Sequence, residues 1–178
     1  MSQQSKEMYE FKKQLKALAN FQGKGTEMIS LYLGPNMQVS DFSSKLRDEF
    51  GQASNIKSKS TQKNVQGAIE RVLQYLKTLS HKAPPNGVAI FAGNISEHEG
   101  KIDIAIFAII PPTPLTTSFY RCESTFQIDP LIEMLEQIGS YGLVVMDGKE
   151  ATVAVLKGKI FKVIRTLTST AHQKTMKG

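Results

Sequence analysis

Apolar residues at helical spacing constrain the fold of this chain most strongly. Between residues 61 and 80 they recur every three or four positions, and residues 41–50 carry a shorter stripe of the same kind. Such spacing gathers apolar side chains on one face of each helix. The stripe residues are Phe42, Leu46, Phe50, Val65, Ile69, Val72, Leu76 and Leu79. We therefore expect two helices that pack against a common core and leave their connection outside it.

The connection between these helices, residues 51–58, reads Gly-Gln-Ala-Ser-Asn-Ile-Lys-Ser. Gly51 fits the left-handed position that often follows a helix end, and Ile56 stands apart from any continuing apolar face. No acidic residue occurs from Gln52 to Ile69. The positive charge comes from Lys57, Lys59 and Lys63. A basic loop on a helical hairpin is typical of an RNA contact, and more often of an ordinary solvated connection.

The remaining patterns predict an α+β fold, with an antiparallel sheet packed with helices. Helices are expected over 6–19, from apolar residues at helical spacing, and from Asp129-Pro130 to about Gly139. The hydroxyl of Ser40 is expected to cap the helix over 41–50. Strands are expected over 28–33, 88–92, 102–110 and 117–122.

The character of the chain changes after residue 138. Three runs rich in β-branched residues, 143–146, 151–156 and 159–167, are separated by Asp147-Gly148 and Lys157-Gly158. Such dipeptides are hairpin signals, so a three-stranded meander is expected. A meander of this size is rarely stable alone. We therefore predict an N-terminal domain over 1–138 and the beginning of an unfinished second domain over 139–178.

Composition narrows the class of protein. The net charge is +6, and residues 151–178 hold six of the 22 Lys and Arg residues and none of the 16 acidic residues. A basic end suggests a polyanionic partner or a solvated tail. One cysteine excludes an internal disulfide and fits a reducing, cytoplasmic location. No apolar run approaches the ~20 residues that cross a bilayer, so no membrane partner is expected.

Signals for catalysis, metals and cofactors are weak. Gly23-Lys24-Gly25-Thr26 lacks the strand-before, helix-after context of a phosphate-binding loop. The histidines, at 81, 98 and 172, share no ligand spacing with Cys122. We expect no metal, no cofactor and no enzymatic activity in this chain by itself.

Several motifs are specific in combination. Asn55-Ile56-Lys57-Ser58 follows Glu49-Phe50-Gly51, the spacing Tyr120-x-Cys122-x-x-x-Phe126 comes later, and Gly25-Thr26 follows the first helix. Their order and separations resemble class-1 peptide chain release factors of the archaeal and eukaryotic type. The resemblance covers nearly the whole chain.

The resemblance implies that unit 1–138 recognises a stop codon. Asn55 can both donate to and accept from uracil, and Lys57 can donate to a carbonyl or a phosphate. Glu49 can accept from the amino group of adenine. Tyr120 and Phe126 would wall the pocket, with Cys122 between them, and Thr26 would lie near the third base. The implied codon-recognition residues are Gly25, Thr26, Glu49, Asn55, Ile56, Lys57, Ser58, Tyr120, Cys122 and Phe126.

Two places depart from the family pattern. Glu27 follows Gly-Thr where the family commonly has serine. Ser124 and Thr125 stand where eukaryotic members often have asparagine and lysine. The sequence alone assigns no role to these three residues.

The resemblance also implies what the whole protein does. In the family, a middle domain carries a Gly-Gly-Gln loop that promotes hydrolysis of peptidyl-tRNA, and a C-terminal domain engages a translational GTPase. Gly178 stands where the first glycine of that loop is expected. The expected partners are the ribosome, through its small-subunit rRNA decoding site, and the stop codons UAA, UAG and UGA of the message.

Two alternatives stay open at this stage. A pelota-like ribosome-rescue factor binds an empty decoding site, but that group lacks the Asn55–Ser58 motif. An RNA-processing enzyme whose active site lies outside this fragment is a second alternative, although no carboxylate cluster or Cys/His pair in the sequence supports it.

Overall fold

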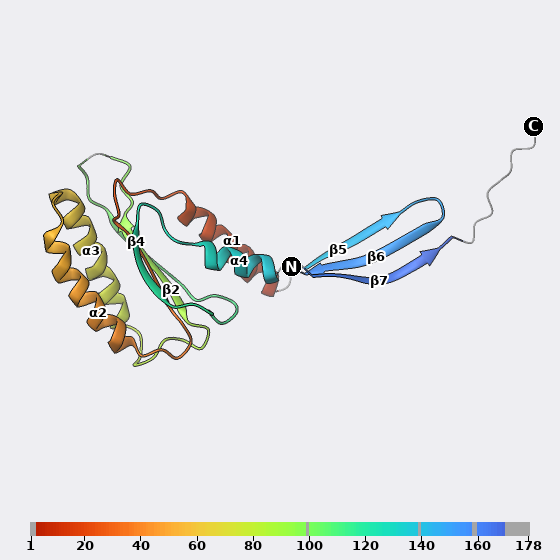
Figure 1. The fold of residues 1–178 in the computed structure, drawn as a ribbon, viewed down its shortest axis with the longest axis horizontal. Helices are drawn as coiled ribbons and strands as arrows, with labels where there is room; N and C mark the ends of the chain where they lie inside the picture. The colour runs from red at the N-terminus through yellow and green to blue at the C-terminus, as the bar shows by residue number, and fades with distance from the viewer. Residues whose placement is uncertain (1–2, 99, 139, 158–159, 170–178) are drawn as a thin grey trace, which may run out of the picture. The chain divides into compact units, whose positions relative to one another are not determined.

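The computed structural model describes residues 3–98, 100–138, 140–157 and 160–169 (Figure 1). Contacts divide the chain into two compact units, Met1–Leu131 and Ile132–Gly178, called unit 1 and unit 2 below. This division falls inside the fourth helix, whereas the sequence predicts a domain boundary where that helix ends. The boundary at 138/139 therefore stays a prediction.

The elements follow in a mixed order along the chain. The helices are α1 (Gln3–Ala19), α2 (Val39–Gln52), the short 3-10 helix η1 (Ala53–Asn55), α3 (Lys59–Leu76) and α4 (Asp129–Ile138). The strands are β1 (Met28–Leu33), β2 (Val88–Asn94), β3 (Ile104–Ile109), β4 (Phe119–Glu123), β5 (Ser140–Met146), β6 (Glu150–Lys157) and β7 (Ile160–Thr168). None of these helices combines the length and apolarity needed to span a bilayer.

Unit 1 contains an antiparallel sheet in the order β3-β2-β1-β4, and the predicted α+β class is confirmed. The central strands β1 and β2 are buried along nearly their whole length, which is why both read as continuous apolar runs. Helices α2 and α3 cover one face of this sheet, and α1 lies on the other side (Figure 1).

The helix-covered face holds the main apolar core. Val65, Ile69, Val72 and Leu76 of α3 are at most 5% exposed, which confirms the predicted stripe at these positions. They pack with alternate residues of β1 and β2. Burying one such side chain stabilises the fold by about 1.5–3 kcal/mol. The helix ends at Leu76, before the predicted end near residue 80, so Leu79 lies outside it.

Aromatic rings fill the opposite face. Phe91 and Phe107 are cross-strand neighbours, and Phe126 meets Phe91 edge-on with ring centroids 5.5 Å apart. Tyr32 stacks on Phe119 at 4.5 Å. The hydroxyl of Tyr32 donates to the carbonyl oxygen of Gln127 at 2.7 Å. Burial, with the nearby charge of Asp129, raises the pKa of Tyr32, so this donor stays protonated.

Helix boundaries near the hairpin differ from the expected ones. Helix α2 begins at Val39 after Gln38, which provides no side-chain cap, and the predicted capping role of Ser40 is wrong. The Ser40 hydroxyl instead donates to Asp41. Backbone pairing fixes this start, because the Val39 amide donates to the carbonyl of His81 at 3.0 Å. The predicted left-handed turn at Gly51 is also wrong, since Gly51 lies within α2 and has no positive φ.

Unit 2 contains an antiparallel sheet in the order β5-β6-β7, as the β-branched runs predict. The Asp147 carboxylate accepts from the backbone amides of Lys149 at 2.7 Å and Glu150 at 2.8 Å. These bonds lower the pKa of Asp147 and close the turn between β5 and β6. Two predictions, the turn at Gly158 and the position of Gly178 at the Gly-Gly-Gln loop, lie outside the described residues.

Two glycines, one in α2 and one directly before β2, provide a matched test of backbone conformation. Replacing Gly51 with Ala should raise the free energy of unfolding by about 0.5–1 kcal/mol, because the site is helical and an added Cβ meets nothing within 4 Å. Replacing Gly87 with Ala should lower it by about 1–3 kcal/mol, because Gly87 has a φ of +77° and the Cβ would clash with the Leu33 carbonyl.

Urea unfolding followed by circular dichroism measures both changes. If Gly51→Ala were destabilising by a similar amount, the glycine would be needed for a left-handed turn and the helical assignment of residue 51 would be wrong.

Candidate functional site

One end of unit 1 brings together segments that are far apart in the sequence. The strand registers place the start of β1 level with the ends of β2 and β4, since Met28 pairs with Glu123 and Ile29 pairs with Ala92. The end of α2, η1 and the start of α3 lie at this same end, at the upper left of Figure 1. The fold therefore gathers the motifs around residues 25, 55 and 122 at one end of the unit.

The segment over 51–58 is largely helical and fixed in position. Ala53 is buried and Ile56 packs against the apolar core, so the prediction that Ile56 stands apart is wrong. The side chain of Gln62 donates to the Ser54 carbonyl at 3.1 Å, which ties η1 to α3. Asn55 and Lys57 flank the half-buried Ile56 and are both exposed. The result is two polar side chains presented to solvent on either side of an apolar anchor.

Ser58 begins helix α3. Its hydroxyl oxygen accepts from the Thr61 amide at 3.4 Å and from the Thr61 hydroxyl at 3.1 Å. This is N-capping, which satisfies an amide that has no partner within the helix. The helix consequently begins at Lys59, two residues before the predicted start.

Tyr120 and Cys122 of β4 form a polar cluster with Glu49 of α2, whose charge acts on both of them. Tyr120 and Cys122 lie on the helix-covered face of β4, and their hydroxyl and sulfur are 3.3 Å apart. Burial raises the pKa of both, and the neighbouring carboxylate of Glu49 raises them further. The cluster therefore offers a protonated phenol and a protonated thiol beside a carboxylate. A protonated thiol is a weak nucleophile, so Cys122 is unsuited to covalent catalysis.

Phe126 lies elsewhere, and its predicted place beside Tyr120 is wrong. It is 5% exposed and contacts Phe21, Phe91 and Phe107, on the opposite face of the sheet. Three residues beyond β4 are enough for the chain to cross the sheet edge. Phe126 therefore supports the site through the core and does not wall it.

The Gly25-Thr26 segment lies against the start of α3. A Cβ on Gly25 would lie 3.8 Å from the Thr61 hydroxyl, and Thr26 is exposed. The next residue, Glu27, is 3% exposed. Its carboxylate accepts from the Lys24 amide at 3.0 Å and from the Asn64 side-chain amide at 2.9 Å. Glu27 thus holds the loop against α3.

Sequence reasoning misses both Glu27 and Asn64 as members of this site. Glu27 directly precedes the buried strand β1, where an acid requires a partner. Asn64 lies four residues before the buried Ala68, on the same helix face. A polar residue on the buried face of this helix indicates a hydrogen-bond partner, and this signal could have identified Asn64.

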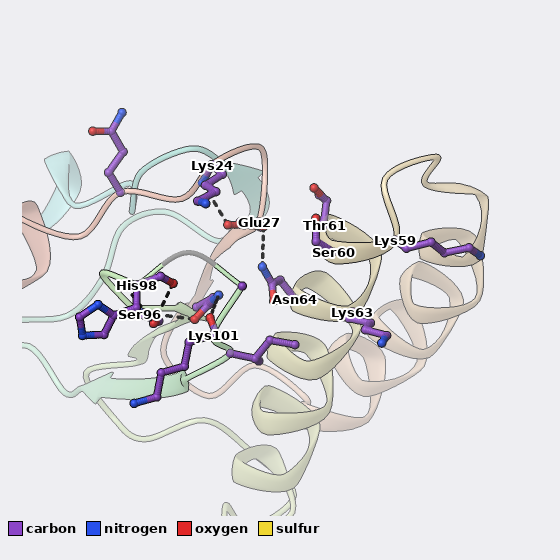
Figure 2. Close-up of a pocket in the computed structure, with 14 residues that line it drawn as sticks. Lys24, Glu27, Lys59, Ser60, Thr61, Lys63, Asn64, Ser96, His98 and Lys101 are labelled. Atoms are coloured by element: carbon purple, nitrogen blue, oxygen red, sulfur yellow. Dashed lines mark hydrogen bonds between the residues drawn. The ribbon is translucent and has the colours of Figure 1, made fainter.

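Beside this segment lies an open cleft of about 490 Å³. Its walls are the loop before β1, the first two turns of α3 and the connection from β2 to β3 (Figure 2). Within the part of the chain that the structure describes, no three His, Cys, Asp or Glu side chains gather as a metal site would require.

A family model described as eRF1 domain 1 matches residues 6–136. The chain belongs to this family. It is 48% identical over 178 residues to the peptide chain release factor subunit 1 of Thermococcus onnurineus, covering 100% of this chain and 43% of the relative. It is 47% identical over 169 residues to the factor of the same name from Methanocaldococcus jannaschii, covering 94% of this chain and 40% of the relative.

A solved structure supports the same family. The crystal structure of the archaeal translation termination factor aRF1 matches with a TM-score of 0.64 and 30% identity, covering 90% of this chain and 44% of that one. The resemblance stated from the motifs is confirmed. This eRF1 domain 1 chain spans less than half the length of these relatives.

The capping role of Ser58 can be separated from any role in binding. Ser58→Ala should lower the free energy of unfolding by about 0.5–2 kcal/mol, because the Thr61 amide loses its acceptor. Ser58→Asp should retain wild-type stability, because aspartate caps helices equally well. Thermal unfolding of both variants measures the difference, and equal losses would contradict the cap.

The Glu27–Asn64 pair should be strongly coupled. Each alanine variant leaves a buried polar group unpaired and should cost about 1–3 kcal/mol. In a double-mutant cycle the coupling energy should be about 0.5–3 kcal/mol. Denaturant unfolding of the three variants measures it, and simple additivity would show that the two side chains do not stabilise each other.

Proposed function

We propose that this chain is the N-terminal part of a translation termination factor, and that the described end of unit 1 reads the stop codon. The observation that carries the proposal is the convergence of Glu49 from α2 with Tyr120 and Cys122 from β4. Glu49 lies near the end of α2, which leads into the segment that exposes Asn55 and Lys57. Single-stranded message leaves base edges available to such groups.

The chemistry of the cluster suits the bases of stop codons. The Glu49 carboxylate accepts from the amino group of adenine and repels a carbonyl oxygen in the same place. The hydroxyl of Tyr120 and the thiol of Cys122 retain their protons and can donate to guanine. Asn55 and Lys57 complement the carbonyl and N–H groups of uracil. One good bidentate contact discriminates by about 1–3 kcal/mol, so rejection of sense codons requires several of them.

The structural roles refine the residue assignments. Thr26, Glu49, Asn55, Lys57, Tyr120 and Cys122 are the proposed contacts with the codon. Ile56 and Ser58 support them by anchoring and capping the hairpin, and Gly25 lies against Thr61 at the start of α3.

The activity of the whole protein is part of the proposal. The complete factor would act in the cytoplasm at the ribosomal decoding site, recognise UAA, UAG and UGA, and promote peptidyl-tRNA hydrolysis through its middle domain. A translational GTPase would bind its C-terminal domain. This chain by itself would recognise the codon without chemistry. The relatives are named as release factors, which favours neither a pelota-like rescue factor nor an RNA-processing enzyme.

Substitutions at Glu49 and Tyr120 test the codon site in the full-length protein. Glu49→Gln should reduce peptide release at least tenfold on one or more stop codons, and unequally among UAA, UAG and UGA, because an amide donates where the carboxylate only accepts. A tenfold loss corresponds to about 1.4 kcal/mol. Tyr120→Phe should also reduce release, because the ring stays and the donor is lost.

The measurement is in-vitro termination on programmed ribosomes, with UGG as the sense-codon control. Lys16→Ala, on the exposed side of α1, is the matched surface variant and should release peptide like the wild type. Wild-type release by both Glu49→Gln and Tyr120→Phe on all three codons would refute the codon site.

A further inference from the structure

Strand β3 is an open edge of the sheet in unit 1. The order β3-β2-β1-β4 leaves it paired on one side only, with β2. The run from Ile104 to Ile110 is the longest uninterrupted apolar stretch in the sequence. Edge strands usually carry a charge, a proline or a bulge that prevents pairing with another strand. The opposite edge, β4, carries Arg121 and Glu123, whereas β3 has none of these devices. Its free side is therefore open to another strand.

The ladder with β2 determines which backbone groups of β3 point outward. The Ile95 amide donates to the Asp103 carbonyl at 2.9 Å, and the register of the two strands places these residues opposite each other. In an antiparallel pair, the residues that bond to the neighbouring strand recur at every second position. The odd-numbered residues of β3 therefore bond to β2, and Ile104, Ile106 and Ala108 direct their N–H and C=O groups to the free edge. Among the described residues, none forms a hydrogen bond with these outward groups.

These outward groups are complementary to those of a second copy of the same strand. Two antiparallel copies of β3 can pair about a two-fold axis at Ile106, so that Ile106 of each copy faces the other. The same register places Ile104 opposite Ala108 and, beyond the ends of the strand, Ile102 opposite Ile110. Ile102 is 52% exposed and Ile110 is 58% exposed, so each covers an apolar side chain that water surrounds in a single copy. Removing this apolar surface from water favours association.

A cleft beside β3 can receive Ile110 of the second copy. It measures about 440 Å³ and lies between α3 and the start of β3. Side chains at alternate positions share one face of a strand, and Ile104 packs on the helix-covered face. Because Ile110 of the second copy would lie opposite Ile102, its side chain would point toward this cleft, and the two-fold axis repeats the contact. The cleft is lined by Gly67, Glu70, Arg71, Gln74, Ile102 and Ile104.

The charges around this edge do not oppose the pairing. Strand β3 itself is uncharged, and the charged residues that line the cleft, Glu70 and Arg71, cancel each other. The net charge of +6 on each copy therefore lies elsewhere in the chain. An apolar contact surrounded by polar side chains is the usual arrangement of a protein interface.

We propose that two copies of this chain associate through β3, in the antiparallel register centred on Ile106. The four strands of each copy then form one continuous eight-stranded sheet. One strand pair and two isoleucine contacts bury less than the roughly 1,200–2,000 Å² of a stable complex, so the association is transient, with a Kd between about 1 μM and 1 mM. Tyr120 and Cys122 belong to β4, at the opposite edge of the sheet. Pairing through β3 therefore does not use the proposed codon site.

Cysteine cross-linking of the full chain tests the register. Ile106→Cys should form a disulfide between copies, because residues of a hydrogen-bonded pair have Cα atoms about 5.5 Å apart, within disulfide range. Ile104→Cys is the matched control on the same strand face, since its two copies would lie four residues, or about 14 Å, apart. The wild type, whose one thiol is the half-buried Cys122, gives the background. Under mild oxidation Ile106→Cys should cross-link at least tenfold faster than Ile104→Cys, and equal rates would overturn the proposal.

A second pair of cysteines avoids the core, against which Ile106 packs. A mixture of Ile102→Cys and Ile110→Cys chains should give a cross-linked dimer, because these two exposed positions face each other across the proposed axis. Either variant alone should not cross-link, since equivalent residues would lie eight positions apart. Cross-linking in the mixture that is no faster than in the separate variants would overturn the register.

Two alanines of β3 test whether its free edge carries the association. Ala108→Pro removes an outward N–H, so it should preserve the fold by circular dichroism and weaken self-association at least tenfold in sedimentation velocity. Ala105→Pro removes an N–H that bonds to β2 at Gly93, so it should lower the unfolding temperature well below that of Ala108→Pro. Unfolding of Ala108→Pro would show that its N–H is bonded to β2 and would overturn the proposal.

Unit 2 has exposed apolar strands of its own and needs a separate control. Val144→Lys places a charge on β5, where Val144 is 62% exposed, and should leave self-association near the wild-type value. Self-association that survives Ala108→Pro but is lost in Val144→Lys would place the contact in unit 2 and overturn the proposal.

Discussion

The packing of α3 against the central strands is the interaction on which the rest of unit 1 depends. Val72, Ile69 and Val65 lie successively closer to the start of the helix, and all are buried against β1 and β2. Their burial fixes both the rotation and the position of α3 along the sheet. The capped first turn and the hairpin before it are then held at one end of the sheet. The polar residues of the hairpin are therefore held in position by the apolar contacts between α3 and the central strands.

The side chains of strand β4 alternate between the two faces of the sheet. Tyr120 and Cys122 point toward α2 and α3, and Phe119 packs with Tyr32 on the other face. Because the period of a strand is two, one segment supplies both a polar cluster and an aromatic contact. The chain then turns, and Phe126 joins the aromatic face. The two halves of the Tyr-x-Cys-x-x-x-Phe spacing therefore have separate physical roles, one polar and exposed in part, the other purely apolar.

Local patterns predicted the elements well, and tertiary contacts account for the failures. The bounds of β1 and the stripe of α3 follow from apolar spacing alone. The start of α2 did not, because the Val39 amide is paired with His81, far away in the sequence. The motifs identified Glu49, Tyr120 and Cys122 as candidate site residues. The packing of Ile56 against the core, the position of Phe126 and the Glu27–Asn64 bond depend on tertiary contacts, which the spacing of residues along the sequence does not specify.

The raised pKa values of Tyr120 and Cys122 determine the pH range over which these two groups keep their protons. Raised pKa values favour the protonated forms of Tyr120 and Cys122, so the folded state binds protons that the unfolded chain releases as pH rises through the ordinary range of thiols and phenols. The cluster therefore loses stability on the alkaline side and is unaffected near neutrality. Across the neutral range both groups remain donors beside the Glu49 carboxylate. For the proposed codon site this constancy matters, because a deprotonated thiol accepts a hydrogen bond where the protonated thiol donates one.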